Sequence, residues 1–548
     1  MTTYKTPGVY VEELSTLPPS VAEVSTAIPA FIGYTAIGPV PDATGKITPV
    51  VNRINTLLDY EALYGGAFPA GFTVTTSGGE ISAVSRNVPA FDFTLYYSLS
   101  LYFKNGGGSC YIVSVGNYTA TPTKEHFLAG LAALEKEDEP TLILLTDAVN
   151  LAAADYLTVV AQQALILCDK LGDRFAILDV GPSGVDDFRN KIGSNSLMYG
   201  AAYYPNVQTA LTYVYQDEQV TIQATGTLLK KVLGANGVVV SYAASASDAP
   251  KVKTVAGAVI DPVAFAISTA KLLTISGIAG KTGTQIVAAW GAWRADPANS
   301  AQTFDIAASG DGSAVLDVTN AVALDSQAAL GTLASIKSSN TTLYNQVKNS
   351  LAGARITLPP SAAVAGIYAS VDRDRGVWKA PANVSLSAVI APAIKLSQAD
   401  QDNLNVDTTA GKSINAIRAF TGKGTLVWGA RTLAGNDNEW RYVSVRRLFN
   451  MIEESSQKAT SFAVFEPNDA TTWLKVKAMI ESYLYGLWQQ GALAGATPDD
   501  AYFVEVGLGK TMRPQDVLEG RMIVKIGVAA VRPAEFIILT FMHKLQQA

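Results

Sequence analysis

The stretch FTLYYSLSLYFKNGGGSCYIVSV, residues 93–115, carries a helix, a stop and a strand in that order. Residues 93–103 are apolar almost all round a helical wheel, which predicts a buried helix. Asn105 and the three glycines after it end that helix, because glycine is disfavoured inside helices and favoured just past their ends. The apolar run Cys110–Val115 then predicts the next strand.

The same alternation continues on both sides of this stretch. Short strands and longer helices alternate along the first 215 residues, an order typical of a parallel sheet covered on both faces. The predicted strands are 28–34, 141–146 and 175–180, and the predicted helices are 124–134 and 153–171. Residues 54–64 are expected to form a helix or a turn.

Two further regions differ from this α/β pattern. From about 215 to 339 the chain is rich in Ala, Gly, Ser, Thr and Val, and we expect an insertion with strands near 219–225 and 237–242. A helix near 342–351 resumes the α/β character. Nearer the end, apolar residues from Trp473 to Leu487 recur at helical spacing, with cap candidates Asn468 and Asp469 before them. Strands at 502–506 and 522–530 complete a small α+β domain.

Each end of the chain carries a short strand separated from the body by proline. Gly8–Glu13 precedes Pro18-Pro19, and Glu535–Phe541 follows Pro533. Proline holds the backbone extended and stops a helix, so each strand lies away from its own domain. Such a strand either stays unpaired or pairs with something distant.

Bulk composition excludes several classes of protein. The 548 residues are 48% hydrophobic and 16% charged, against about 25% charged in typical domains, and the net charge is −6. This balance argues against nucleic-acid binding, which needs clustered Lys and Arg. We expect no membrane insertion, because no stretch approaches the roughly 20 apolar residues of a span. The two cysteines make no disulfide framework, and the N-terminus lacks a signal sequence, so we expect assembly in the cytoplasm.

Motifs for catalysis, cofactors and metals are weak. The histidines His126 and His543 lack partners at metal-ligand spacing, so we expect no metal and no cofactor. Triplets of the type Gly-Lys-Ser/Thr begin at Gly280, Gly411 and Gly509. Each lacks the glycine that a phosphate-binding loop needs five residues earlier. A Ser-His-Asp arrangement is not excluded by order alone, although no G-x-S-x-G turn occurs. We therefore expect that the protein is not an enzyme.

Several segments, in order, resemble contractile tail sheath proteins of phages and bacterial contractile injection systems. Together they cover about residues 1–215 and 340–548, whereas 216–339 has no counterpart. The segments that carry the resemblance are YKTPGVYVEE (4–13), NGGGSCYIV (105–113), LPPS (358–361), AGIYA (365–369), the stretch from Asp372 through GVWKAPAN (376–383), NEWRYVSVRR (438–447) and FEPN (465–468).

The resemblance implies a multidomain fold with a subtilisin-like but non-catalytic α/β core. It also implies a small α+β C-terminal domain and extended terminal arms. The composition of residues 216–339 adds the expectation of an inserted β-rich domain. We expect an N-terminal arm (1–26), a core (27–215 and 340–430), a surface insertion (216–339), a C-terminal domain (431–531) and a C-terminal arm (532–548).

The function implied is a subunit that polymerises helically around an inner tube and contracts to drive that tube through a target envelope. Partners would be further copies of the chain, the tube protein, and baseplate and terminal cap proteins. The arms would exchange strands between subunits, and the C-terminal helix would face the tube through Lys475, Lys477 and Glu481. The exchanged residues would be Gly8, Val9, Tyr10, Val11, Glu12 and Glu13, and Glu535, Phe536, Ile537, Ile538, Leu539, Thr540 and Phe541.

Alternatives remain open at this point. An injection-system sheath is the main hypothesis, released as an extracellular particle, and the tail sheath of a contractile phage, part of a virion, is the second. A hydrolase on a related α/β fold is a third and would need a nucleophile near His126. A fourth is that the insertion binds glycans or a cell envelope.

Overall fold

The computed structural model describes residues 21–43, 45–77, 80–224, 227–244, 249–300, 302–324, 331–338 and 340–539, and the statements below concern these residues. The predicted strand over 8–13 lies outside them, as do Thr540 and Phe541. The chain divides into two compact units. The first comprises Met1–Phe68, Ala90–Leu211 and Arg355–Ala548, and the second comprises Pro69–Pro89 and Thr212–Ala354.

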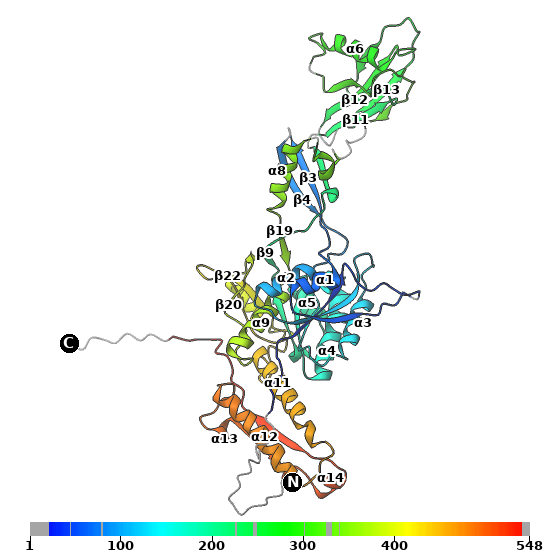
Figure 1. Ribbon diagram of the computed structural model, residues 1–548. Helices are drawn as coiled ribbons and strands as arrows, with labels where there is room; N and C mark the ends of the chain where they lie inside the picture. Colours follow the sequence, from blue (N-terminus) through cyan, green and yellow to red (C-terminus); the bar gives the residue numbers. More distant parts are fainter. Residues whose placement is uncertain are drawn as a thin grey trace, which may run out of the picture. The chain divides into compact units, whose positions relative to one another are not determined.

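A nine-stranded mixed sheet is the centre of the first unit (Figure 1). Its inner strands run parallel from β5 to β22, as the alternating pattern predicts, while β2, β23 and β20 pair antiparallel at the edges. In spatial order the strands are β2 (Val50–Ile54), β5 (Cys110–Asn117), β1 (Pro29–Thr35), β6 (Leu142–Leu144), β7 (Phe175–Asp179), β8 (Gly200–Tyr204), β22 (Asn415–Phe420), β23 (Gly424–Trp428) and β20 (Val384–Ser385).

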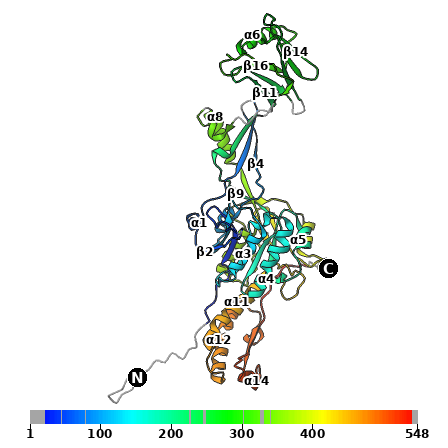
Figure 2. The same cartoon turned by 90° about the vertical axis from the view of Figure 1, so that its right-hand side faces the viewer.

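Helices cover both faces of this sheet, and strand β1 shows the alternation. Phe31 packs on Tyr102 of one helix with ring centroids 5.2 Å apart, whereas Tyr34 packs on Phe127 of another at 5.7 Å. Helices α3 and α4 lie together over one face (Figure 2). The helical segments of this part are α1 (Leu57–Tyr64), α2 (Leu95–Lys104), α3 (Lys124–Leu134), η1 (Ala148–Asn150), the π-helical η2 (Ala154–Ala161), α4 (Gln162–Leu171), α5 (Val185–Lys191), η3 (Leu197–Tyr199), α9 (Ser361–Arg375) and α10 (Gln398–Asn405).

The remainder of the first unit is a short three-stranded sheet and a C-terminal region. That region packs an antiparallel strand pair against a long helix whose buried side includes Val476, Ile480, Leu484 and Leu487, as the helical spacing predicts. Its elements are α11 (Val443–Ala459), η5 (Thr460–Ala463), α12 (Ala470–Gln489), α13 (Pro498–Ala501), β24 (Tyr502–Val506), α14 (Pro514–Leu518) and β25 (Val524–Val528). The short sheet comprises β19 (Arg355–Leu358), β9 (Val207–Thr212) and β21 (Val389–Pro392).

The second unit contains two apolar cores. Residues 71–87, which we expected in the α/β core, form a hairpin of β3 and β4, and β3 also pairs with β10 in the second unit. The first core includes β3 (Gly71–Ser77), β4 (Glu80–Asn87), η4 (Asp217–Gln219), β10 (Val220–Ala224), β18 (Gly331–Thr332), α7 (Leu333–Ile336) and α8 (Thr341–Leu351). The second comprises β11 (Thr227–Leu233), β12 (Val238–Ala244), β13 (Lys251–Val255), β14 (Ala264–Ile267), β15 (Leu272–Ser276), α6 (Gly283–Arg294), β16 (Phe304–Ala308) and β17 (Val322–Ala323).

A buried carboxylate ties three segments of the central sheet together. Asp147, just after β6, accepts hydrogen bonds from the backbone N–H groups of Tyr34 (2.9 Å), Thr94 (2.7 Å) and Leu95 (3.0 Å). Burial raises the pKa of Asp147 to about 6, although the hydrogen bonds from these groups lower it. The carboxylate therefore stays ionised near neutral pH and holds the N-terminus of α2 on the sheet.

We expect Asp147→Ala to lower the free energy of unfolding by about 3 kcal/mol, because it leaves buried N–H groups without an acceptor. Urea unfolding followed by circular dichroism measures this. The matched control is Asp155→Ala, which removes a half-exposed ion pair with Lys124 and should cost less than about 1 kcal/mol. Equal losses in the two variants would contradict the assignment.

Candidate assembly site at the roots of the terminal arms

The C-terminal arm is held to the body of the first unit at Glu535. Its carboxylate accepts hydrogen bonds from Arg431 Nε (2.9 Å), Asn405 Nδ2 (3.0 Å) and the Tyr442 hydroxyl (3.2 Å). The Arg431 side chain is only 4% exposed and Glu535 only 22%, so little water competes with the pair. We call residues 531–535 the C-arm root.

Contacts that do not involve the arm also position Arg431. The residue follows β23, and its backbone exchanges two 2.8 Å hydrogen bonds with the buried Asn415 side chain of β22. Its guanidinium also donates to the Asn405 carbonyl at 3.1 Å. The edge of the central sheet therefore presents a prepared cation to Glu535.

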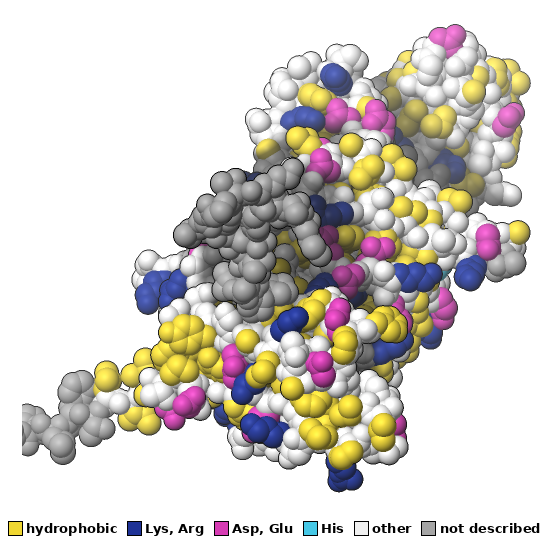
Figure 3. Space-filling model, turned by 60° about the horizontal axis from the view of Figure 1, so that its bottom comes forward, with side chains coloured by type: hydrophobic (Ala, Val, Ile, Leu, Met, Phe, Trp, Pro, Cys, Tyr) yellow, Lys and Arg dark blue, Asp and Glu magenta, His cyan; other side chains and the backbone are white. Residues whose placement is uncertain are grey.

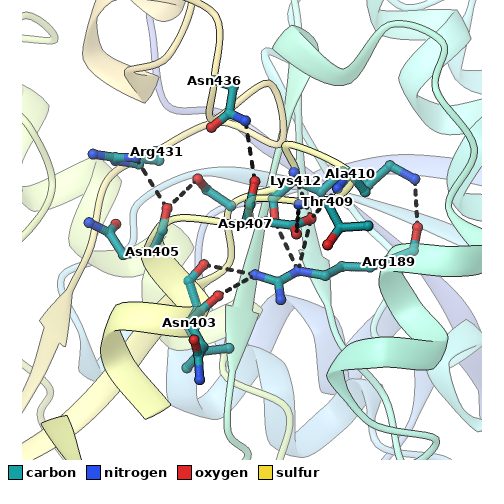
Figure 4. Close-up of polar contacts among 11 residues, drawn as sticks. Arg189, Asn403, Asn405, Asp407, Thr409, Ala410, Lys412, Arg431 and Asn436 are labelled. Atoms are coloured by element: carbon teal, nitrogen blue, oxygen red, sulfur yellow. Dashed lines mark hydrogen bonds and ion pairs between the residues drawn. The ribbon is translucent and has the colours of Figure 1, made fainter. Parts of the chain in front are cut away.

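A polar loop after α10 supports this arrangement (Figure 4). The Asp407 carboxylate accepts from the backbone N–H groups of Thr409 (3.0 Å), Ala410 (3.2 Å) and Lys412 (3.1 Å), which closes the loop on itself. Arg189 of α5 lies 3.5 Å from the same carboxylate and donates to the Asn403 carbonyl at 2.7 Å. Helix α5 and the loop are thus locked together beside the C-arm root.

Lys412 belongs to one of the Gly-Lys-Ser/Thr triplets, and its ammonium has an internal partner. Nζ donates to the Arg189 carbonyl at 2.5 Å, and burial lowers the pKa of Lys412. The lysine holds α5 to the loop, as a structural rather than a phosphate-binding residue.

Beyond Glu535 the chain leaves the body with apolar side chains exposed. Phe536, Ile537, Ile538 and Leu539 are 70%, 79%, 87% and 72% exposed, and none of them forms a strand within this chain. Figure 3 shows the arm as a run of yellow side chains that leads into grey residues. Four consecutive large apolar residues in water are unfavourable, so this segment is suited to burial against another surface.

The N-terminal arm has a matching root at residues 23–28. Arg447 of α11 donates to Asp372 of α9 at 3.0 Å and to the Thr26 carbonyl at 2.7 Å, and the Thr26 hydroxyl donates to Asp372 at 2.6 Å. The Arg447 and Asp372 side chains are 3% and 6% exposed. Both arms therefore begin at a largely buried arginine–carboxylate pair.

An apolar hollow of about 880 Å³ lies in the C-terminal region, and we call it the C-domain groove. Helices α11 and α12 wall it with Ile452, Val476 and Ile480, and strand β25 borders it with apolar side chains. Strands β24 and β25 form a two-stranded sheet, so each has one edge without a strand partner among the described residues. Such edges are templates for pairing with another chain.

The predicted tube-facing residues lie on the outer side of α12. Lys477 and Glu481 form an i, i+4 ion pair at 3.5 Å, and Lys475 is exposed. The three residues lie on one helix, and their contact with a tube stays a prediction.

The hydrolase alternative requires a nucleophile beside His126. His126 Nδ1 instead lies 2.7 Å from the Tyr34 hydroxyl, and Ser361, at the start of α9, donates to Asp179 at 2.5 Å. Neither pair is the serine–imidazole contact of a hydrolase.

Over the described ranges, no group of three or more His, Cys, Asp or Glu residues is placed to hold a metal ion, and no helix is long and apolar enough to cross a membrane.

Sequence reasoning missed the partners of the arm roots. That Glu535 lies in an exchanged strand stays a prediction, and within this chain its carboxylate binds Arg431. Arg431 lies 104 residues away from it, and no local spacing connects the two. Asp372 and Arg447 both lie in segments that carry the family resemblance, which is the one signal that could have singled them out.

Replacing Glu535 with Gln should loosen the C-arm root, because a neutral amide gives up the charged part of the contact with Arg431. We expect hydrogen exchange at the Val531 amide, which donates to the Ala492 carbonyl, to become about tenfold faster, as a loss of about 1.4 kcal/mol implies. Exchange mass spectrometry measures it. Glu519→Gln, at an exposed ion pair with Arg521, is the control and should leave that amide unchanged.

Acid should loosen the same root. Burial raises the pKa of Glu535, but hydrogen bonds from Arg431 and Asn405 outweigh it and leave the pKa below its usual value. A lowered pKa means that the anchoring is complete above about pH 4.3, the unperturbed value for glutamate, and is lost as pH falls through the folded-state pKa. Exchange at Val531, corrected for its intrinsic pH dependence, should rise below about pH 4. In Glu535→Gln this rise should disappear, and its persistence there would assign the effect to another group.

Comparisons with known proteins show that the chain is similar to tail sheath proteins. The phage tail sheath C-terminal domain family matches residues 435–543. The tail sheath protein of Vibrio phage KVP40 is 26% identical over 188 residues, which are 34% of this chain and only 26% of that protein.

Among the solved structures that match nearly the whole chain are two contracted sheaths. The helical sheath of the anti-feeding prophage in its contracted state is 28% identical, with TM-score 0.56 over 99% of this chain and 100% of that one. The sheath of the extracellular contractile injection system PVC, also contracted, is 28% identical, with TM-score 0.55 over 99% of each chain. Residues 435–543 thus match the tail sheath C-terminal domain family, and nearly the whole chain is similar to two solved contracted sheaths.

Proposed function

We propose that this chain is the sheath subunit of a bacterial contractile injection system, in which copies polymerise helically around an inner tube and contract to drive it through a target envelope. The observation that carries the proposal is the C-terminal arm, an apolar segment held out from the body by the Arg431–Glu535 pair.

The arms connect the copies by strand exchange. A segment that adds to the edge of a neighbour's sheet gains main-chain hydrogen bonds, and its alternate side chains set the register. Each bond contributes only about 0.5–1.5 kcal/mol net, but a lattice repeats it in every subunit. Because donor and acceptor surfaces differ, the contact is heterologous and builds an open helix rather than a closed dimer.

Strand β25 and the C-domain groove are the acceptor in this proposal. A third strand paired to β25 would bury apolar side chains over Val476 and Ile480, which line the groove. Residues 536–541 of another copy supply such side chains, and residues 8–13 supply a second strand.

Contraction is then a change of packing between subunits whose strand links persist. The roots keep each arm attached to the central sheet while bodies rotate against one another.

Further partners follow from the same assembly. Helix α12 would face the inner tube through Lys475, Lys477 and Glu481, and sheath ends would meet baseplate and cap proteins.

The core, which we take to be subtilisin-like, acts as scaffold without catalytic activity. The particle would be assembled in the cytoplasm and released. The injection system is favoured over a phage tail because the PVC injection-system sheath is 28% identical to this chain over 99% of its length.

Purified full-length protein should form tubes visible by negative-stain electron microscopy, and protein lacking residues 1–15 should not. Ile538→Asp should also abolish tubes, because a charge cannot be buried in the acceptor without a partner. Ile260→Asp is the matched control, since Ile260 is 91% exposed and lies in the second unit. We expect it to form tubes. Tubes formed by both Ile538→Asp and the truncated chain would contradict strand exchange by the arms.

A further inference from the structure

The turn between η5 and α12 holds an aromatic residue in an unusual backbone conformation. Val464 has φ −69° and ψ 125°, Phe465 has φ +69°, and the Glu466 amide donates to the Ala463 carbonyl at 3.2 Å. These values define a type II turn, whose third position normally requires glycine or asparagine. A phenylalanine there is strained, since side chains rarely enter the left-handed region.

The side chains of this turn gain nothing within the chain that offsets the strain. Phe465 is fully exposed and Val464 is 63% exposed. Both border the C-domain groove, on its side formed by η5. Strain and exposure at the same residue are each unfavourable in the isolated chain, so burial in an assembly would favour this conformation.

The turn is held in place from its C-terminal side. Asn468 accepts a hydrogen bond from the Trp473 indole at 2.7 Å and donates to the Arg521 carbonyl at 3.1 Å. Asp469 then caps α12 by accepting from the Thr472 amide at 3.0 Å. Phe465 is therefore presented at the groove by a preorganised turn.

The two arms of the chain differ in what they need from an acceptor. In residues 8–13 one face of a strand would carry Val9 and Val11, while the other carries Tyr10 and Glu12 and can face water. Residues 536–541, FIILTF, are apolar on both faces except for one threonine. A strand of that kind needs cover above and below, because near-continuous apolar runs belong to strands buried on both sides.

We propose that Phe465 closes over the C-terminal arm of a second copy when this arm occupies the C-domain groove. The groove wall covers one face of residues 536–541, and Phe465 with Val464 covers the other. This inference rests on the proposed strand exchange and names the residue that makes the groove specific for the C-terminal rather than the N-terminal arm.

Phe465→Gly tests it, because glycine fits the turn and removes only the side chain. The isolated chain should unfold at the same or a higher temperature, whereas the concentration needed for tubes, measured by sedimentation, should rise at least about tenfold, as for an interface anchor. Phe465→Tyr, which keeps an aromatic ring, should assemble as the unmodified chain does. Leu518→Ala, at a residue 82% exposed outside the groove, is the control and should assemble normally.

Cysteine crosslinking gives a second readout that does not depend on affinity. Phe465→Cys is combined with Cys at 536, 537, 538 or 539 and oxidised at a concentration where tubes form; the native Cys110 and Cys168 are buried. Neighbouring copies should crosslink at positions of one parity only, either 536 and 538 or 537 and 539, because a strand turns alternate side chains to one face.

The outcomes separate this inference from the proposed function. Normal assembly of Phe465→Gly, or crosslinks at no position or equally at all four, would overturn the role of Phe465 while leaving strand exchange intact. Assembly that survives Ile538→Asp would overturn strand exchange by the C-terminal arm, and the Phe465 inference with it.

Discussion

The structure depends on a buried arginine–carboxylate pair at the root of each terminal arm. Arg447 with Asp372, and Arg431 with Glu535, decide where the chain leaves its own body. Pairs of this kind contribute little net stability, since desolvation offsets attraction, but losing one partner is costly and makes the geometry specific. An exchanged strand requires that specificity, because an arm free to fold back would bury its apolar side chains against its own chain.

Other elements of the first unit carry or position the residues of these two pairs. The nine-stranded sheet carries Asn415, which positions Arg431, and helices α9 and α11 carry Asp372 and Arg447. The loop around Asp407 joins α5 to the edge where the C-terminal arm departs. In the proposed assembly, stable elements hold the roots and the segments beyond them add to neighbouring copies. A sheath needs this division, since its subunits must move against one another without separating.

Local signals in the sequence predicted much of the fold. The helix at 124–134 and the strand at 502–506 have the predicted bounds, and Asp469 caps α12 as its position indicated. Long-range features were not predictable in this way. The pairing of β3 with β10 joins residues about 150 apart, and the partner of Glu535 lies 104 residues earlier. The π-helical start of the segment after Ala153 has no signature in its apolar spacing. The groove and the strained Phe465 emerge only when η5, α12 and β25 are packed together.

The most direct test of strand exchange is a cryo-electron microscopy map of the assembled tube at side-chain resolution, traced through residues 531–541. The account predicts that Glu535 stays on Arg431 of its own chain while residues 536–541 pair with β25 of a neighbouring copy. A map in which residues 536–541 return to their own chain, or lie in solvent without a strand partner, would contradict it.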